Sequence, residues 1–361
     1  MSVRMYKFII VLYVLLPLLS IIGAIFLLWN RYVFMSDLIL LAALYVFTGL
    51  GITVGYHRML THKSFGAPEW LRGLILIGGA AGFEGSPADW AARHIEHHAH
   101  SDEEGDPHSP LHGFWHAHVG WIYAMADHKP DIQKWAPHLL QDKTVMFVSR
   151  YTVLWMILSL VIPYLIGGWT GLLWGGGVRV FLVTHVTWSV NSICHTFGRR
   201  DFETTDESRN NWLVGLLAAG EGWHNNHHAF PDSAMHGLRW WQFDGSGLFI
   251  WSMEKIGLFW DVKRIPEETQ KAHAERSISM QAARKIVFDE LMTAMENAQQ
   301  ELRKMKASGV ETMQRAATDA MHRLQEIHMH VTIATHLKRQ RLKQYKDELE
   351  LLVQRCKMLP S

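Results

Sequence analysis

The sequence predicts an all-α membrane protein with four transmembrane helices, a helical cytoplasmic cap that carries histidine clusters, and a helical C-terminal extension. Three observations support this prediction. Uncharged apolar runs of about 20 residues, each long enough to cross a hydrocarbon core of ~30 Å, interrupt residues 1–266. The 23 histidines gather largely in polar stretches between these runs. Residues 267–361 are charged and contain only Phe288 and Tyr345 as aromatic residues.

Composition restricts the chemistry of the chain. The formal net charge of +1 excludes little, but Cys194 and Cys356 are the only two cysteines. The sequence therefore lacks a disulfide framework, a CxxC zinc ribbon and a cysteine-ligated iron–sulfur cluster. Any electrons for a redox reaction must come from another protein.

Two apolar runs make up the predicted first segment, residues 1–56. One extends from residue 8 to residue 29 after Arg4 and Lys7, and the other extends from residue 34 to residue 56. Because a basic cluster follows the second run at once, the positive-inside rule places this cluster and the N-terminus in the cytoplasm. A cleaved signal peptide is the alternative for the first run, but the run is longer than a signal core and lacks a small-x-small cleavage site.

Two segments, 57–145 and 196–266, are predicted to form the cytoplasmic cap. Both are polar and rich in histidine. The first also contains a short apolar stretch, 71–81, that suits a buried or interfacial helix because it is too short to span. All the histidine clusters then fall on the same side of the membrane.

The segment 146–195 is predicted to leave the cytoplasm and return to it. Its two spans, 146–169 and 172–190, are separated by a tight turn at Thr170-Gly171. Two polar residues lie inside the second of these spans. Arg179 is expected to snorkel toward the outer interface, and His185 is expected to be hydrogen-bonded within the bundle.

The extension, residues 267–361, is helical by pattern. Apolar residues recur at alternating spacings of three and four along 287–305 and again along 310–334, and Ser308-Gly309 separates these two heptad stripes. A helical hairpin, an intermolecular coiled coil that would give self-association, and a solvated helix without a specific partner all fit this pattern.

Spacing within the histidine clusters favours metal binding. His94, His97 and His98 lie at about 0°, 300° and 40° around an α-helix, so their imidazoles share one face and can converge on a metal. The same spacing recurs in a second cluster, made of His224, His227 and His228.

Four further residues extend the candidate ligand set. Asn191 and His195 share a helix face at the i, i+4 spacing, whereas His57 and His62 lie about 140° apart on an ideal α-helix. These last two either belong to different metals or lie where the second span unwinds. Nine histidines and one asparagine exceed the four to six ligands that one ion takes, so two metals are implied.

Ligand type restricts the metal only partly, because imidazole suits iron, copper and zinc. A structural zinc site would be closed by four ligands and would not need nine histidines. The carboxylate pattern of soluble di-iron bundles is also missing, since only Glu221-x-x-His224 fits it. We therefore expect a redox-active dinuclear site at a membrane surface, which activates O2 against an unactivated C–H bond of a lipid.

Five stretches within about residues 51–262 resemble the membrane fatty-acid desaturases, specifically the Δ9 or stearoyl-type enzymes of bacterial type. They are Gly51-Ile-Thr-Val-Gly-Tyr-His57-Arg-Met-Leu-Thr-His62, Trp90-Ala-Ala-Arg-His94-Ile-Glu-His97-His98, Gly105-Asp-Pro-His108, Thr187-Trp188-Ser-Val-Asn191-Ser-Ile-Cys-His195 and Gly220-Glu-Gly-Trp-His224-Asn-Asn-His227-His228. Other histidines of the cap, His108 among them, are expected to support the ligands rather than to bind metal.

This resemblance implies a cis double bond inserted into a saturated acyl chain, with O2 and two Fe ions (Fe2+/Fe3+) held by the nine histidines. It also implies that Asn191 reaches one iron through water, and that Trp90, Thr187 and Trp188 line the bend of an acyl tunnel. The partners implied are the bilayer and an external donor of ferredoxin, rubredoxin or cytochrome b5 type with its reductase. The expected location is a bacterial cytoplasmic membrane, with both termini in the cytoplasm.

The chain departs from the animal desaturases near the substrate. Glu84 stands where they have a tunnel glutamine, and Ala92-Arg93 replaces an Arg-Asp pair associated with the CoA headgroup. Acyl-CoA and acyl-lipid substrates therefore both remain open.

Chain length is predicted to be set along the second span. Gly49 lies eight residues before His57, which is about 12 Å along a helix at 1.5 Å per residue. The nine bonds from C9 to C18 extend roughly 11 Å, about 1.25 Å of axial advance for each C–C bond of ~1.5 Å. Gly49 then marks the end of the tunnel and Tyr45 its floor, although close helix packing is an alternative reason for the glycine.

Two other classes of protein share some of these features. A membrane di-iron hydroxylase or monooxygenase of alkyl or lipid substrates would use similar histidine clusters, and its product would be an alcohol instead of an alkene. A non-catalytic metal-binding membrane scaffold would show no turnover that depends on O2 and an electron donor.

Overall fold

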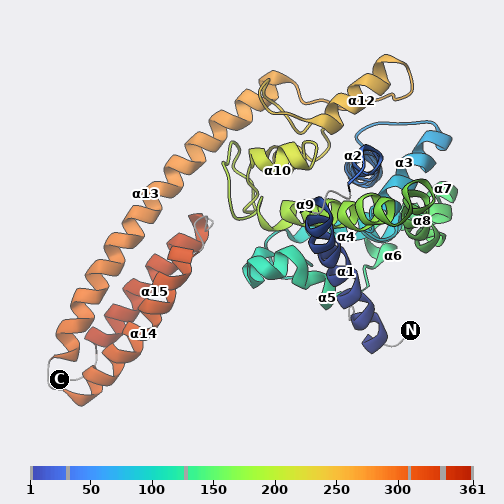
Figure 1. Cartoon of the computed structure of the whole chain (residues 1–361). Helices are drawn as coiled ribbons and strands as arrows, with labels where there is room; N and C mark the ends of the chain where they lie inside the picture. Colours follow the sequence, from blue (N-terminus) through green and yellow to red (C-terminus); the bar gives the residue numbers. More distant parts are fainter. Residues whose placement is uncertain (1–2, 30–32, 126–128, 308–309, 334–338, 359–361) are drawn as a thin grey trace. The chain divides into compact units, whose positions relative to one another are not determined.

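The computed structural model describes residues 3–29, 33–125, 129–307, 310–333 and 339–358 (Figure 1). Its regular elements are helices, so the all-α prediction is confirmed for these residues. The chain divides into two compact units, Met1–Glu267 and Glu268–Ser361, and each is described separately below.

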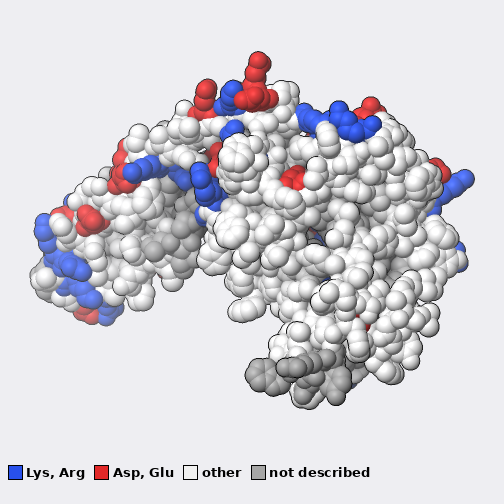
Figure 2. Space-filling view, turned by 45° about the horizontal axis from the view of Figure 1, so that its top comes forward, with Lys and Arg blue, Asp and Glu red and all other residues white. Residues whose placement is uncertain are grey.

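Three stretches of the first unit are long and apolar enough to cross a membrane: Arg4–Leu28, Met35–Thr61 and Thr152–Ser192, with mean hydropathies of 2.8, 2.2 and 1.8. They correspond to helix α1 (Val3–Trp29), to α2 (Met35–Leu50) with the π-helix η1 (Gly51–Thr61), and to α8 (Thr152–Gly171) with the π-helix η5 (Leu172–Val178) and α9 (Arg179–Ser192). The protein is an integral membrane protein. On the face shown in Figure 2, charged side chains gather along an edge, and much of the remaining surface is nearly free of them.

The third stretch, at 41 residues, is about twice the length that one crossing needs. Gly168 interrupts its helical backbone with φ 60° and ψ −144°. The Arg179 guanidinium donates to the Ser159 carbonyl at 3.1 Å, although 20 residues separate them. In one straight helix these residues would lie ~30 Å apart, so the stretch folds back on itself as a pair of antiparallel helices.

Arg179 is fully buried, and the expectation that it snorkels to the outer interface is wrong. Its guanidinium also donates to the carbonyls of Ala81 at 2.6 Å and Gly175 at 3.1 Å. Ala81 is the last residue of α3 (Glu69–Ala81), where the helix dipole places partial negative charge. His185 is hydrogen-bonded to His118 across 3.0 Å, as the sequence suggested for a histidine inside the bundle.

Helix η1 crosses α3 at very close range. A Cβ on Gly51 would lie 2.0 Å from the backbone nitrogen of Gly79, so only glycine fits at this crossing. No such contact exists at Gly49, where an added Cβ would meet no heavy atom within 4 Å. The close helix packing that was considered as a reason for Gly49 is therefore found at Gly51 instead.

The remaining elements of the first unit are short and carry the polar residues of the cap. Capping sets several of their starts: Ser86 accepts from the Asp89 amide at 3.1 Å at the start of α4, and Asp244 accepts from the Gly247 amide at 2.8 Å at the start of α12. These elements are α4 (Pro87–His100), η2 (Pro110–His112), η3 (His116–Gly120), α5 (Trp121–Ala124), α6 (Ile132–Trp135), η4 (Pro137–Gln141), α7 (Lys143–Arg150), α10 (Trp212–Leu217), α11 (His224–Ala229) and α12 (Gly245–Lys255).

The second unit is built from α13 (Glu267–Lys306), α14 (Glu311–Ile333) and α15 (Arg339–Lys357), which lie side by side (Figure 1). Both predicted stripes are buried against each other and against α15, in a core that includes Leu291, Leu302, Leu324, Ile327, Tyr345 and Leu349. The apolar stripes are thus buried by helices of the same chain. One of these helices, α15, was not recognised as a separate helix in the sequence analysis. Ser308-Gly309 and Ala334 lie outside the described residues.

Candidate metal centre

The nine histidines named from the sequence form two groups. One group contains His57, His62, His94, His98 and His227, and the other contains His97, His195, His224 and His228. Within each group, one nitrogen from every ring lies within 4.8 Å of the others. Two ligands on opposite sides of an ion with bonds of about 2.1 Å are about 4.2 Å apart, so each group has the size of one coordination sphere.

The π-helix η1 explains how His57 and His62 reach the same group. On an α-helix they would point in different directions, but the His62 amide donates to the His57 carbonyl at 3.1 Å, an i+5 to i bond. Their ring centroids are 4.8 Å apart. The sequence allowed two interpretations of this pair: ligands of different metals, or residues at a place where the winding of the second span changes. The structure favours the second interpretation.

Both histidine triplets are divided between the groups. On α4, His94 and His98 join the first group and His97 joins the second. On α11 the division is reversed, because His227 joins the first group, whereas His224 and His228 join the second. Each triplet therefore contributes rings to both groups, whereas the helix-face argument only showed that its members could share one ion.

The orientation of the rings fits a bound cation. The His57 Nδ1 donates to Glu221 across 2.5 Å, so its Nε2 carries a lone pair, and this atom lies 3.0 Å from the Nε2 of His227. In the second group the His195 Nδ1 donates to Asp102 at 2.9 Å, while its Nε2 lies 2.9 Å from the Nε2 of His224. Each such pair can share one Nε2 proton, or a metal ion placed between the two atoms can accept lone pairs from both rings.

Five ring nitrogens of the two groups are buried without a hydrogen-bond partner among the described residues: the Nε2 atoms of His62, His97 and His228, and the Nδ1 atoms of His224 and His227. Buried polar atoms are rarely left in this state. The two groups thus present a donor set of imidazoles only, which suits a redox-active first-row metal.

Four carboxylates hold histidines of the two groups from behind, and the sequence analysis assigned none of them this role. Asp102 contacts His195, Asp106 contacts His97 at 3.0 Å, Asp206 contacts His228 at 2.6 Å, and Glu221 contacts His57. Such partners fix which ring nitrogen faces the metal. Asp102 and Asp106 closely follow the cluster of His94, His97 and His98, and Glu221 precedes His224, but nothing in the spacing marks Asp206.

Electrostatics differ among these carboxylates. Burial by itself would raise the pKa of Asp206, but the facing His228 and its hydrogen bond hold that pKa well below its usual range. For Glu221, burial dominates and raises the pKa to about 7, although the neighbouring Arg58 opposes this shift. Arg58 lies 3.0 Å from Glu221 and 3.0 Å from Asp244, and so ties η1 to the loop that precedes α12.

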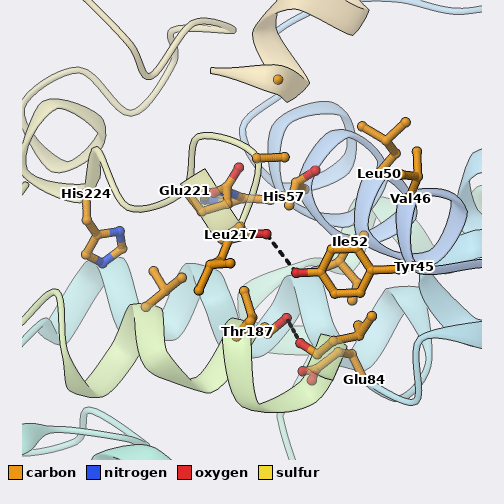
Figure 3. A pocket seen from close by; sticks show the side chains of 18 of the residues that line it. Tyr45, Val46, Leu50, Ile52, His57, Glu84, Thr187, Leu217, Glu221 and His224 are labelled. Carbon is orange, nitrogen blue, oxygen red and sulfur yellow. Dashed lines mark hydrogen bonds and ion pairs between the residues drawn. The ribbon is translucent and has the colours of Figure 1, made fainter. Parts of the chain in front are cut away.

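A cavity of about 490 Å³ opens beside the histidines (Figure 3). His57, His94 and His224 line it, and so does Asn191, which lies on α9 four residues before His195. Most of the other lining residues are apolar. Tyr45 lies across the cavity from His224 and donates from its hydroxyl to the Leu217 carbonyl at 2.7 Å.

Five of the six residues named from the sequence for the substrate line this cavity: Tyr45, Gly49, Glu84, Trp90 and Thr187. The sixth, Trp188, is buried and is not among the lining residues. It packs in one cluster with Trp121, which does line the cavity. Trp188 therefore supports the wall of the cavity from behind.

Two groups of imidazoles, backed by carboxylates and opening on an apolar cavity at the membrane, define a membrane protein with a di-metal centre. Comparison with known proteins identifies the class more closely. Residues 29–244 match the family "Fatty acid desaturase". The chain belongs to the fatty acid desaturase family and is an oxidoreductase of that family.

Three relatives show the range within this family. The chain is 40% identical over 274 residues to the hex-5-enoyl-[acyl-carrier protein] acetylenase of Moorena producens (strain JHB), which covers 70% of this chain and 84% of the relative. It is 44% identical to the palmitoyl-monogalactosyldiacylglycerol delta-7 desaturase of Arabidopsis thaliana, over 63% of this chain and 62% of that one. It is 41% identical to the sn-1 stearoyl-lipid 9-desaturase of Anabaena variabilis, over 60% and 79%. The position of the modified bond thus varies among the relatives.

A first prediction concerns His97, one of the four rings of the second group. His97→Ala removes a ring nitrogen and takes one hydrogen-bond partner from the buried Asp106, so we expect bound metal to fall from two ions per chain toward one. Metal content per chain, measured by mass spectrometry on the purified protein, checks this. His322→Ala, at an exposed position on α14, is the control and should keep both ions. Two ions retained in His97→Ala would remove His97 from the metal centre.

A second prediction concerns Glu84, whose pKa burial raises to about 8. The unfolded chain releases this proton near pH 4.5 and the folded chain near pH 8, so the stability of the fold decreases as pH rises between these values. Glu84→Gln removes this dependence. The difference in Tm between the variant and the wild type, in detergent, should grow in favour of the variant from pH 5 to pH 8. A constant difference would show that Glu84 is ionised at neutral pH.

Proposed function

We propose that the protein is an O2-dependent acyl desaturase that holds two iron ions in the two histidine groups and inserts a cis double bond at the Δ9 position of a saturated acyl chain. The observation that carries the proposal is the adjacency of the histidine groups to the apolar cavity. An acyl chain in this cavity would pass the metals with its methyl end toward Tyr45. The imidazole ligands and the need for redox chemistry support iron, because zinc has no redox activity.

The bound metals would supply the activation of O2, and the residues of the chain supply the remaining requirements. The carboxylates behind the rings keep His57, His97, His195 and His228 in the tautomer that offers Nε2 to the metal. Asn191 lies where a water between its amide and a metal could be held. Apolar walls exclude bulk water from the reacting carbons, which prevents side reactions.

We further propose four membrane crossings, with the antiparallel pair α8 and α9 as the third and fourth. The basic residues near the N-terminus and after η1 support a cytoplasmic location for both termini and for the metal groups. A bacterial cytoplasmic membrane suits the sequence resemblance. Because the chain has no cysteine cluster, an external electron donor with its reductase completes the system.

The open part of the cavity supports a lipid-linked substrate. Its exposed lining residues are apolar, namely Val46, Leu216, Leu217, Phe243 and Leu248. An acyl chain could enter here from the bilayer without crossing a charged surface. CoA carries several negatively charged phosphate groups, but Arg93 is the one Lys or Arg among the described lining residues. The Arg93 guanidinium lies 5.3 Å from the centre of the Trp121 ring. We therefore propose an acyl-lipid in place of acyl-CoA.

Expression in a host that lacks desaturases tests this function. We expect cis-Δ9 monounsaturated chains in the membrane glycerolipids, identified by mass spectrometry of derivatised double bonds, and none in a strain that carries His97→Ala. An alcohol as the product would indicate a hydroxylase, and a metal-loaded protein without turnover would indicate a scaffold. Purified protein offered stearoyl-lipid and stearoyl-CoA in parallel, with donor and reductase, decides between the two carriers.

Gly49 supplies a test of chain length. Because an added Cβ at this position meets open space in the cavity, Gly49→Phe should fill the end of the acyl site without disturbing the helices. We expect a severalfold shift in product from 18-carbon toward 16-carbon chains in a host with both, at unchanged metal content. The variant Gly49→Ala should shift this ratio less. An active Gly49→Phe variant with the wild-type ratio would remove Gly49 from the acyl site.

A further inference from the structure

A tenth histidine, His236, lies beside the first metal group and belongs to neither group. Its side chain is only 1% exposed, in the loop between α11 and α12. The backbone on both sides of the ring is fixed, because the His236 amide donates to Asp244 at 2.7 Å and its carbonyl accepts from the Asn226 side chain at 2.8 Å. The position of the imidazole is therefore determined by the fold.

The ring of His236 contacts two histidines of the first group. Its centroid lies 4.5 Å from that of His227, with the ring planes 32° apart, and 5.3 Å from that of His57. Its Nδ1 lies 3.5 Å from the Glu221 oxygen that accepts from His57. Neither nitrogen has a hydrogen-bond partner among the described residues. An apolar side chain would fill this space without the cost of burying two unpaired polar atoms.

The second group contains a similar arrangement. His108, which is also buried and outside the group, has its Nδ1 3.5 Å from the Asp106 oxygen that holds His97. The rings of His108 and His97 are 4.3 Å apart. Each metal group thus has one carboxylate that faces both a ring of the group and an additional imidazole.

A third metal ion held by His57, Glu221 and His236 is geometrically possible, since their ligand atoms lie within 4.8 Å of one another. Charge opposes it. Arg58 already places its Nε 3.2 Å and its Nη2 3.0 Å from the other Glu221 oxygen, so a cation there would face a fixed positive charge. The His57 Nδ1 is also occupied by its bond to Glu221.

We propose that His236 is a positioning residue of the first metal group: it packs against the His227 ring and restrains Glu221, so that His57 and His227 keep their Nε2 atoms directed at one ion. This inference rests on the proposed function only in requiring that a metal fills the first group. It does not depend on the substrate or on the position of the double bond.

Cobalt binding tests this role without reference to turnover. The full chain is purified in detergent, freed of metal, and titrated with Co2+, whose visible absorption reports the geometry of its ligands. For His236→Leu, we expect one of the two ions to bind ten- to a hundredfold more weakly, with a shifted spectrum for that ion. His236→Gln, which keeps a hydrogen-bonding group near Glu221, should recover most of the affinity and the wild-type spectrum.

His118→Leu is the matched control, because His118 is also buried and hydrogen-bonded, to Ser192 and His185, but lies outside both groups. It should bind two ions with the wild-type spectrum. Wild-type affinity and spectrum in His236→Leu would overturn the proposal. Equal losses in His236→Leu and His236→Gln would also overturn it, because a polar group beside Glu221 would then contribute nothing to the metal group. A wild-type protein that binds two ions but forms no alkene would contradict the proposed function and leave the role of His236 intact.

Discussion

The constraint on which the rest of the structure depends is the repulsion among nine imidazole rings in one buried region. Rings whose Nε2 atoms lie 2.9–3.1 Å apart cannot all be stabilised by hydrogen bonds to each other, because a neutral ring has only one N–H. Carboxylates take up this N–H in the rings that they contact. Several ring nitrogens remain without a partner among the described residues, and two metal ions would accept their lone pairs. The helices, caps and close glycine contacts hold these rings in place.

Two short helices, α4 and α11, each carry three of the nine histidines at the same spacing, and the rings of each helix are divided between the two metal groups. On α4 the outer members of the triplet serve the first ion and the inner member serves the second, and on α11 these assignments are exchanged. Each ion therefore receives two rings from one helix and one from the other. The remaining rings come from η1 and from His195, just beyond α9, so four separate parts of the chain meet at the centre.

Much of this was predictable from local spacing, and the failures have physical causes. The helical class, the apolar stretches and the nine clustered rings all follow from the periodicity of neighbouring residues. A change of winding in the second span was one of two interpretations of His57 and His62, but its π-helical form could not be chosen from the sequence, because it is defined by backbone hydrogen bonds between residues five apart. Asp206 and His236 were missed because only the folded chain brings them to the rings. Arg179 was misplaced because its partners are backbone carbonyls, which a sequence does not distinguish.

The helical stretch formed by α2 and η1 links the position of a metal-group ring to the position of a residue that lines the acyl cavity. The same continuous stretch carries Gly49, which lines the cavity, and His57, one of the rings of the first metal group. Each residue inserted or removed between them would shift Gly49 along the helix axis relative to His57 and rotate it around that axis. If Gly49 bounds the acyl chain as proposed, a change in the number of residues would alter the length of the acyl site and misdirect a ring of the metal group together. A change of side-chain size at Gly49 would alter the acyl site alone.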